Sequence, residues 1–312
     1  METLSRFISS ESLPPSALRR DHTPSTSKKI DEGLWSRRRA TGWESEELSW
    51  LDENILWCLV SVRVMTRDQI KKLWYPKGTI RAVNWRLKKL KDRKLIEDLP
   101  AGSIAQAVWT FTARGLGALQ EVLAWKSLVL PFEPPIPRRI RESTIRHQLA
   151  VAEVFVGAIQ GETVKAQIDA LATIRWQDGW RRRLEYTYGA EERRLYPDVY
   201  FGVRGSERWY AYLEIDRGTE DGTVLRETFE KYGQFFCIGH RGEQPPTLIF
   251  ICPGESRRDF VRKIFESVSP TYRSKLQSFR AFTMAESVGL LKRYMAVGSF
   301  LADLKAEYPS GV

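Results

Sequence analysis

Cysteine, histidine and long apolar runs are scarce in this chain, and each scarcity excludes a class of protein. The three cysteines among 312 residues are far apart and form no C-x-x-C pair, so neither a disulfide framework nor a zinc site is expected. The three histidines stand singly, which excludes a metal centre built from a histidine cluster. No run of about 18 apolar residues is present to span a membrane, and the N-terminus lacks the apolar core of a signal peptide. We therefore expect a cytoplasmic protein with no membrane partner.

Hydrophobic side chains are abundant enough to build folded domains. They make up 42% of the residues, and Trp, Tyr and Phe together number 36, which favours a folded chain over a disordered one. At the usual ~100–200 residues per domain, the length allows about two domains. Neither the GxxxxGK[ST] loop nor the GxSxG motif occurs, so ATP-driven helicase or transposition activity is not expected.

Positive charge is concentrated in one short window. Between Arg63 and Lys94 there are twelve Lys or Arg and only two acidic residues, a net charge of +10 that equals the net charge of the whole chain. The remainder is therefore close to neutral. A focused basic patch of this kind is typical of proteins that bind nucleic acid, and a solvated helical surface is the alternative.

The same window has the element order of a winged helix-turn-helix domain. Residues 49–62 and 66–75 fit two short helices, the second capped by Thr66, and residues 79–96 fit a third whose outer face is basic. Residues 96–112 then fit a β-hairpin. In this domain type the third helix enters the major groove of DNA, although a winged helix that contacts proteins is the alternative. The residues expected to bind nucleic acid are Lys71, Lys72, Arg81, Asn84, Arg86, Lys88, Lys89, Lys91 and Arg93.

Changes in composition divide the chain into four parts. Residues 1–44, rich in Ser, Thr, Pro and basic residues, are expected to form a flexible basic tail. The winged helix-turn-helix is expected at 45–127, and a cluster of four prolines predicts an extended linker at 128–140. The order of helix, antiparallel hairpin, helix, buried strand and helix in 141–312 predicts an α/β sandwich. The expected fold class is therefore mixed α/β.

Two neighbouring strands of the second domain carry three carboxylates near one end. Side chains alternate across a strand, so Glu214 and Asp216 share one face of ERWYAYLEID. In a hairpin that turns at 204–206, Asp198 on the preceding strand lies level with both. Carboxylates this close repel one another unless a cation joins them, and Mg²⁺ or Mn²⁺ is the ion that oxygen ligands favour. In the alternative, Asp216 begins a loop and Glu214 pairs with a nearby arginine.

These strands carry a family resemblance. YPDVYFGV, WYAYLEIDRGTE and LRETFEKY, following a proline-linked winged helix, resemble the replication-relaxation proteins of plasmids and mobile elements over roughly residues 48–290. The PD-x₁₅-E-I-D core is similar to the PD-(D/E)XK restriction-endonuclease-like fold. The resemblance implies that Asp198 and Glu214 are metal ligands. This sequence differs from the motif of that fold at one position, where Asp216 replaces the lysine.

The resemblance also implies the remaining site residues. Lys231 would replace the missing lysine, and Glu153 on the first helix would add an acid, with His147 near the same face. The expected catalytic set is Asp198, Glu214, Asp216, Lys231 and Glu153, and the expected metal ligands are Asp198, Glu214 and Asp216. Bound metal would lower the pKa of a coordinated water, and Lys231 or Arg217 would stabilise charge on the phosphate. Tyr232 is a conceivable nucleophile, with a core tyrosine as the alternative.

Two functions follow from these expectations. The first is a metal-dependent DNA-processing protein that nicks or relaxes plasmid or mobile-element DNA during replication or transfer. Its partners would be double-stranded DNA and other replication or transfer proteins. The alternative is a non-catalytic DNA-binding initiator, repressor or assembly factor with a degenerate nuclease-like domain, which the missing lysine favours.

Overall fold

The computed structural model of the chain describes eight stretches, with gaps between them. They are residues 48–100, 102, 104–125, 142–161, 174–178, 184–203, 206–239 and 247–293. The expected tail at 1–44 and linker at 128–140 lie outside the described residues, so the expected division into domains stays a prediction. Among the described helices, none combines the length and the apolar character that crossing a bilayer requires.

The first part of the chain combines helices with a small antiparallel sheet. In this sheet the strand order is β1-β3-β2, and both pairings are antiparallel. The elements are α3 (Trp50–Val62), β1 (Val64–Thr66), α4 (Arg67–Trp74), α5 (Ile80–Asp92), β2 (Ile96–Leu99), β3 (Val108–Phe111) and α6 (Ala113–Trp125).

Local sequence fixes where these helices begin. Ser49, Thr66 and Thr79 each accept a hydrogen bond from the backbone N–H three residues later, which satisfies one of the free donors at the start of α3, α4 and α5. In α5, Val83 and Leu87 are buried at the spacing expected of one helix face. Ile80, three residues before Val83, is 40% exposed, because it lies in the first turn, where α5 begins.

The second part is built on a five-stranded mixed sheet with the order β10-β9-β8-β7-β4. The β4–β7 and β7–β8 pairs are antiparallel, whereas β8–β9 and β9–β10 are parallel; β5 and β6 form a separate two-stranded ribbon. The elements are α7 (Glu142–Ile159), β4 (Ile174–Asp178), β5 (Leu184–Tyr188), β6 (Glu191–Leu195), β7 (Val199–Val203), β8 (Ser206–Ile215), α9 (Gly222–Gly239), β9 (Thr247–Cys252), α10 (Glu255–Glu266), α11 (Pro270–Arg273) and β10 (Arg280–Thr283), followed by helical residues 284–293.

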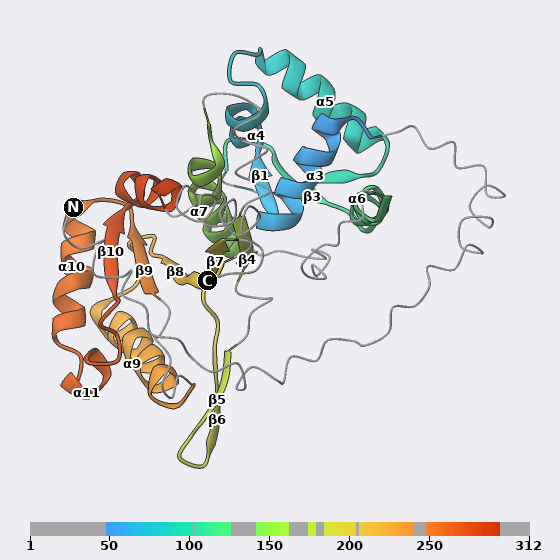
Figure 1. Cartoon of the computed structure of the whole chain (residues 1–312). Helices are drawn as coiled ribbons and strands as arrows, with labels where there is room; N and C mark the ends of the chain where they lie inside the picture. The colour runs from blue at the N-terminus through green and yellow to red at the C-terminus, as the bar shows by residue number, and fades with distance from the viewer. Residues whose placement is uncertain are drawn as a thin grey trace, which may run out of the picture. The chain divides into compact units, whose positions relative to one another are not determined.

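Helices cover both faces of this sheet (Figure 1). Because side chains alternate along each strand, Val199 and Leu213 pack in one apolar cluster with α7. Tyr200 and Tyr212, one residue away on each strand, pack in a second cluster with α9 and α10. The predicted mixed α/β class is therefore confirmed, and the second part has a helix–sheet–helix layering.

Helix α7 contacts both parts of the chain. It packs against α3, α4 and β1 on one side and against β8 on the other (Figure 1). The first apolar cluster accordingly includes Leu56 and Val83 from the first part, Phe155 from α7, and Leu213 from the sheet. Helix α7 therefore joins the sheet to the basic first part, and α3 also contacts β4 directly.

Candidate functional site

The outer face of α5 carries the exposed part of the basic patch. Burial of Val83 and Leu87 turns Arg81, Asn84 and Lys89 toward solvent, and all three are exposed. Among the described residues, none forms an ion pair with Arg81 or Lys89. These side chains are therefore available for an external partner.

Four other cations of the predicted DNA-binding set have internal acidic partners. Arg86 Nη1 lies 3.1 Å from Oδ1 of Asp52, whose side chain is only 2% exposed. The remaining pairs are Lys88–Asp92 at 2.7 Å, Lys91–Asp98 at 2.5 Å and Lys72–Glu153 at 2.9 Å. Arg86 is therefore largely structural, whereas the side chains of Lys88 and Lys91 stay 74% and 48% exposed beside their acids. Lys71 and Arg93 are partly buried.

Sequence reasoning missed one residue of this face, Trp85. Its side chain is 60% exposed, although a tryptophan is usually largely buried. The guanidinium carbon of Arg86 lies 5.5 Å from the centre of its ring. Trp85 also lines an open hollow of about 470 Å³ at the start of α5, together with Tyr75 and Arg81. The sequence did contain a signal for this position, because Trp85 lies four residues after Arg81 and four before Lys89 and so shares their helix face.

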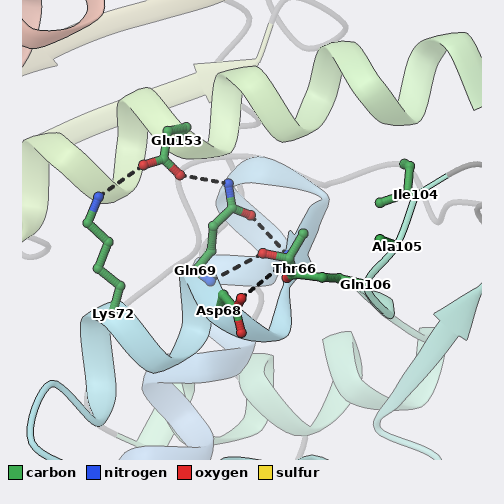
Figure 2. A pocket seen from close by; sticks show the side chains of 8 residues that line it. All are labelled: Thr66, Asp68, Gln69, Lys72, Ile104, Ala105, Gln106 and Glu153. Atoms are coloured by element: carbon green, nitrogen blue, oxygen red, sulfur yellow. Dashed lines mark hydrogen bonds and ion pairs between the residues drawn. The ribbon is translucent and has the colours of Figure 1, made fainter. Parts of the chain in front are cut away.

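The predicted catalytic Glu153 lies at the junction of α4 and α7 and points toward α4 (Figure 2). Its carboxylate accepts hydrogen bonds from Lys72 Nζ at 2.9 Å and from Gln69 Nε2 at 3.2 Å. Gln69 also donates to the carbonyl of Leu149 at 3.1 Å. The placement of Glu153 with the acids of the sheet is therefore wrong, because its carboxylate is used to hold α7 against the first part.

The β7–β8 register brings two of the predicted acids to the same end of the sheet. Val199 pairs with Leu213, and continuing this register places Asp198 level with Glu214. The two side chains nevertheless turn to different helices. Asp198 Oδ2 accepts the backbone N–H of Ile215 at 2.7 Å, and Oδ1 lies 2.8 Å from Nε2 of His147 on α7. The hydrogen bond to this carboxylate raises the pKa of His147 above its usual value.

Glu214 turns instead toward α9. The hydroxyl of Tyr232, a fully buried residue, donates a hydrogen bond to Oε1 of Glu214. Burial raises the pKa of Glu214 well above its usual value, and repulsion from Asp198 adds to this effect. Burial and the neighbouring Glu214 likewise raise the pKa of Tyr232. Tyr232 is therefore a core residue, as the alternative to a nucleophile had it, and its hydroxyl is used by Glu214.

Asp216 belongs to a loop and has a full set of partners. Its side chain is 1% exposed and pairs with Arg257 of α10, with Nε 2.5 Å from Oδ2 and Nη2 3.2 Å from Oδ1. Oδ1 also accepts the N–H of Gly218 at 2.7 Å, closing a turn in which that glycine has a φ of +76°. Arg257 further donates to the carbonyl of Glu220 at 2.6 Å. The alternative reading of Asp216 as the start of a loop thus describes its observed position, with Arg257 as the partner that sequence reasoning missed.

Two further predicted residues lie outside these contacts. Lys231 is exposed on α9, and its nearest paired carboxylate is Glu227 at 4.0 Å, whereas the adjacent Tyr232 points inward. Arg217 is partly buried and donates to the carbonyl of Ser143 at 3.4 Å. No described contact brings Lys231 to the carboxylates, so its proposed replacement of the missing lysine has no geometric support.

The carboxylates fit a three-ligand metal site poorly. Within the described stretches, no group of three or more His, Cys, Asp or Glu has positions that suit a metal ion. Asp216 is already neutralised by Arg257, and both oxygens of Asp198 are hydrogen-bonded. A cation held by Asp198 and Glu214 would first have to displace His147 or Tyr232.

Comparisons with known proteins address the family. A solved structure of a cysteine-to-serine mutant of Lactococcus lactis ZitR in complex with DNA is 23% identical, over 33% of this chain and 76% of that chain, with a TM-score of 0.23. Comparison with the curated proteins gives no match. The family model described as replication-relaxation matches residues 56–249, a span that includes both α5 and the Asp198–Glu214 end of the sheet. Since this match covers more than half of the chain, the protein belongs to the replication-relaxation family.

Proposed function

We propose that the chain binds duplex DNA through the outer face of α5 and acts in replication of a plasmid or mobile element. The observation that carries this proposal is the exposed row Arg81, Asn84 and Lys89, whose cations have no acidic partner within the described stretches, inside a window that holds the net charge of the chain. Phosphate groups are the complementary partner for such a row. The helix–helix–hairpin order around α5 is that of a winged helix-turn-helix, in which this helix enters the major groove.

The salt dependence of DNA affinity tests the proposal. Neutralising Arg81 and Lys89 together, as Arg81→Ala/Lys89→Ala, removes two phosphate contacts. The slope of log affinity against log salt concentration is therefore expected to become shallower by roughly two units. Fluorescence anisotropy with labelled duplex at about 50–200 mM salt measures the slope.

A charge-matched control separates the α5 face from net charge. Lys263→Ala/Lys275→Ala removes two exposed cations from the second part of the chain and should leave the slope unchanged. Equal slopes for the α5 double variant and the wild type would show that α5 does not contact DNA.

The internal partners of the carboxylates favour a DNA-binding role without catalysis. Asp216 is held by Arg257, Asp198 by His147 and Glu214 by Tyr232. Each acid therefore already stabilises packing between the sheet and a helix. In this proposal the second part orients the DNA-binding part through α7.

Metal-dependent nicking is the second candidate function. The observation in its favour is the repulsion between Asp198 and Glu214, which contributes to the raised pKa of Glu214 and which a divalent cation would relieve. Asp198 and Glu214 would hold Mg²⁺ or Mn²⁺, which would supply an activated water and neutralise a phosphate. His147, displaced from Asp198, would then be placed to take up a proton.

Conversion of supercoiled plasmid to open circles tests this second candidate. It predicts nicking by the wild type with Mg²⁺ or Mn²⁺, and a loss of at least about 100-fold in Asp198→Asn, since several kcal/mol of charge stabilisation disappear. Glu153→Gln is the matched control, because Glu153 binds α4 and should leave the rate unchanged. Equal yields from the wild type and Asp198→Asn would eliminate nicking at this centre.

A further inference from the structure

An exposed indole lies in the middle of the basic face of α5. Trp85 is 60% exposed, and Arg81 and Lys89 stand one turn before and one turn after it. The row from Arg81 to Lys89 extends about 12 Å along the helix. This length matches the width of the major groove of B-DNA, about 12 Å. An apolar surface is therefore centred on the stretch of helix that would lie against base edges.

The indole is supported from behind by a fixed cation. The guanidinium of Arg86 lies 5.5 Å from the ring centre of Trp85 and is bonded to Asp52 at 3.1 Å and to Ser49 Oγ at 3.3 Å. Asp52 in turn takes part in the capping box of α3. Because Arg86 is fixed to α3, the cation beside the indole ring keeps a constant position.

The chemistry of this surface selects one kind of base-edge group. The indole presents a flat apolar face flanked by Arg81 and Lys89, beside a hollow of about 470 Å³ at the start of α5. In the major groove, the C5-methyl of thymine is the one apolar group that a base edge displays, whereas the other groups accept or donate hydrogen bonds. The flanking cations match the phosphates on either side of the groove.

We propose that Trp85 reads a thymine methyl in the major groove and so provides sequence preference, while Arg81 and Lys89 provide affinity. This inference rests on the proposed function, because it requires duplex DNA along α5. It adds one feature of the DNA site, a T·A pair under the middle of α5. A base of single-stranded DNA stacked on the indole is the competing occupant. The duplex is favoured because the distance between Arg81 and Lys89 along α5 matches the width of the major groove.

Replacement of thymine by deoxyuridine tests the inference, because it removes one methyl group and keeps every hydrogen bond. A preferred duplex is first selected from a random pool with the full chain, and each thymine is then replaced singly. We expect affinity to fall roughly threefold to fivefold at one or two positions, the effect of one buried methyl group. Trp85→Ala should bind the thymine and deoxyuridine duplexes equally, and Trp85→Phe should keep part of the difference.

Matched variants and outcomes separate this inference from the function on which it rests. Arg81→Ala should bind all duplexes more weakly and still distinguish thymine from deoxyuridine. The inference is overturned if the wild type binds the selected duplex with no sensitivity to any replacement, if Trp85→Ala stays as sensitive as the wild type, or if single strands bind more tightly than the duplex. Failure of the pool to yield any salt-dependent duplex binding would overturn the proposed function as well.

Discussion

Arg257→Met is expected to lower the free energy of unfolding by about 3–5 kcal/mol, because it leaves a buried carboxylate without its cation. The side chains of Asp216 and Arg257 are 1% and 17% exposed, and two of their N–O contacts are 2.5 and 3.2 Å. Methionine keeps much of the apolar stem but removes the charge, together with the contact of the guanidinium carbon with the Phe260 ring at 5.0 Å. Urea denaturation of the two proteins at neutral pH measures the difference.

Two comparisons show whether the loss comes from this ion pair. Asp216→Asn/Arg257→Met removes both charges and should be more stable than Arg257→Met alone. This difference is the coupling between the two residues that a double-mutant cycle measures. Lys88→Met breaks an exposed pair with side chains 74% and 61% exposed, so it should change stability by at most about 0.5 kcal/mol. If the free energy of unfolding of Arg257→Met lies within about 1 kcal/mol of the wild-type value, Asp216 is hydrated and free to act as a metal ligand.

Glu214→Gln is expected to stabilise the protein increasingly as the pH rises. The folded-state pKa of Glu214 lies well above its unfolded value, through burial and the charge of Asp198. The folded protein therefore binds the proton more tightly, and the contribution of Glu214 is full below the unfolded pKa of about 4.3 and is lost as the pH rises toward the folded pKa. Between these pH values the variant should gain about 1.4 kcal/mol over the wild type for each pH unit. Glutamine keeps an oxygen to accept the Tyr232 hydroxyl.

A carboxylate with the opposite shift is the matched control. The N–H of Thr283 and Arg258 bond to Glu286 and lower its pKa, so its contribution is present above the unfolded pKa and lost as the pH falls. The stability of Glu286→Gln relative to the wild type should therefore fall, rather than increase, as the pH rises from acid toward neutral. Parallel stability curves for the wild type and Glu214→Gln between about pH 4.5 and 8 would contradict a raised pKa for Glu214.

The same pair of proteins separates the two candidate functions. A divalent ion that binds only the folded state raises its stability by an amount set by ligand concentration and affinity. Metal-dependent nicking predicts that Mg²⁺ near pH 8 stabilises the wild type but leaves Glu214→Gln unchanged. The non-catalytic role predicts that Mg²⁺ stabilises neither protein.

Local sequence predicted much of the structure around α5 and the β7–β8 hairpin. Thr66 caps a helix as expected, because the hydroxyl and the N–H it accepts are only three residues apart. Alternation of side chains placed Asp198 and Glu214 near the same end of the hairpin, but their level positions depend on a register shift between Gly202 and Val203 that the sequence did not indicate. Helix caps and alternation depend on short-range geometry, which a single sequence contains. The charged ribbon of β5 and β6 was missed, because EERRL has a single apolar residue and gives no alternation to pair with that of LEYTY.

The partners of the acidic residues were less predictable, because they come from distant parts of the chain. Arg257 lies 41 residues beyond Asp216, and Lys72 lies 81 residues before Glu153. Nothing near either acid in sequence indicates these pairs, since packing of α10 on the sheet and of α7 on α4 brings them together. A cluster of carboxylates therefore predicted a metal, whereas the fold supplies Arg257, a histidine and a tyrosine.

Photocrosslinking from position 84 tests DNA binding by α5 most directly. A photoreactive amino acid in place of the exposed Asn84, in the middle of the outer face of α5, should form a covalent adduct with duplex DNA. The adduct should disappear as salt is raised, and the same amino acid in place of Lys263 on α10 should form none. Crosslinks from position 263 but not from position 84 would contradict the placement of DNA along α5.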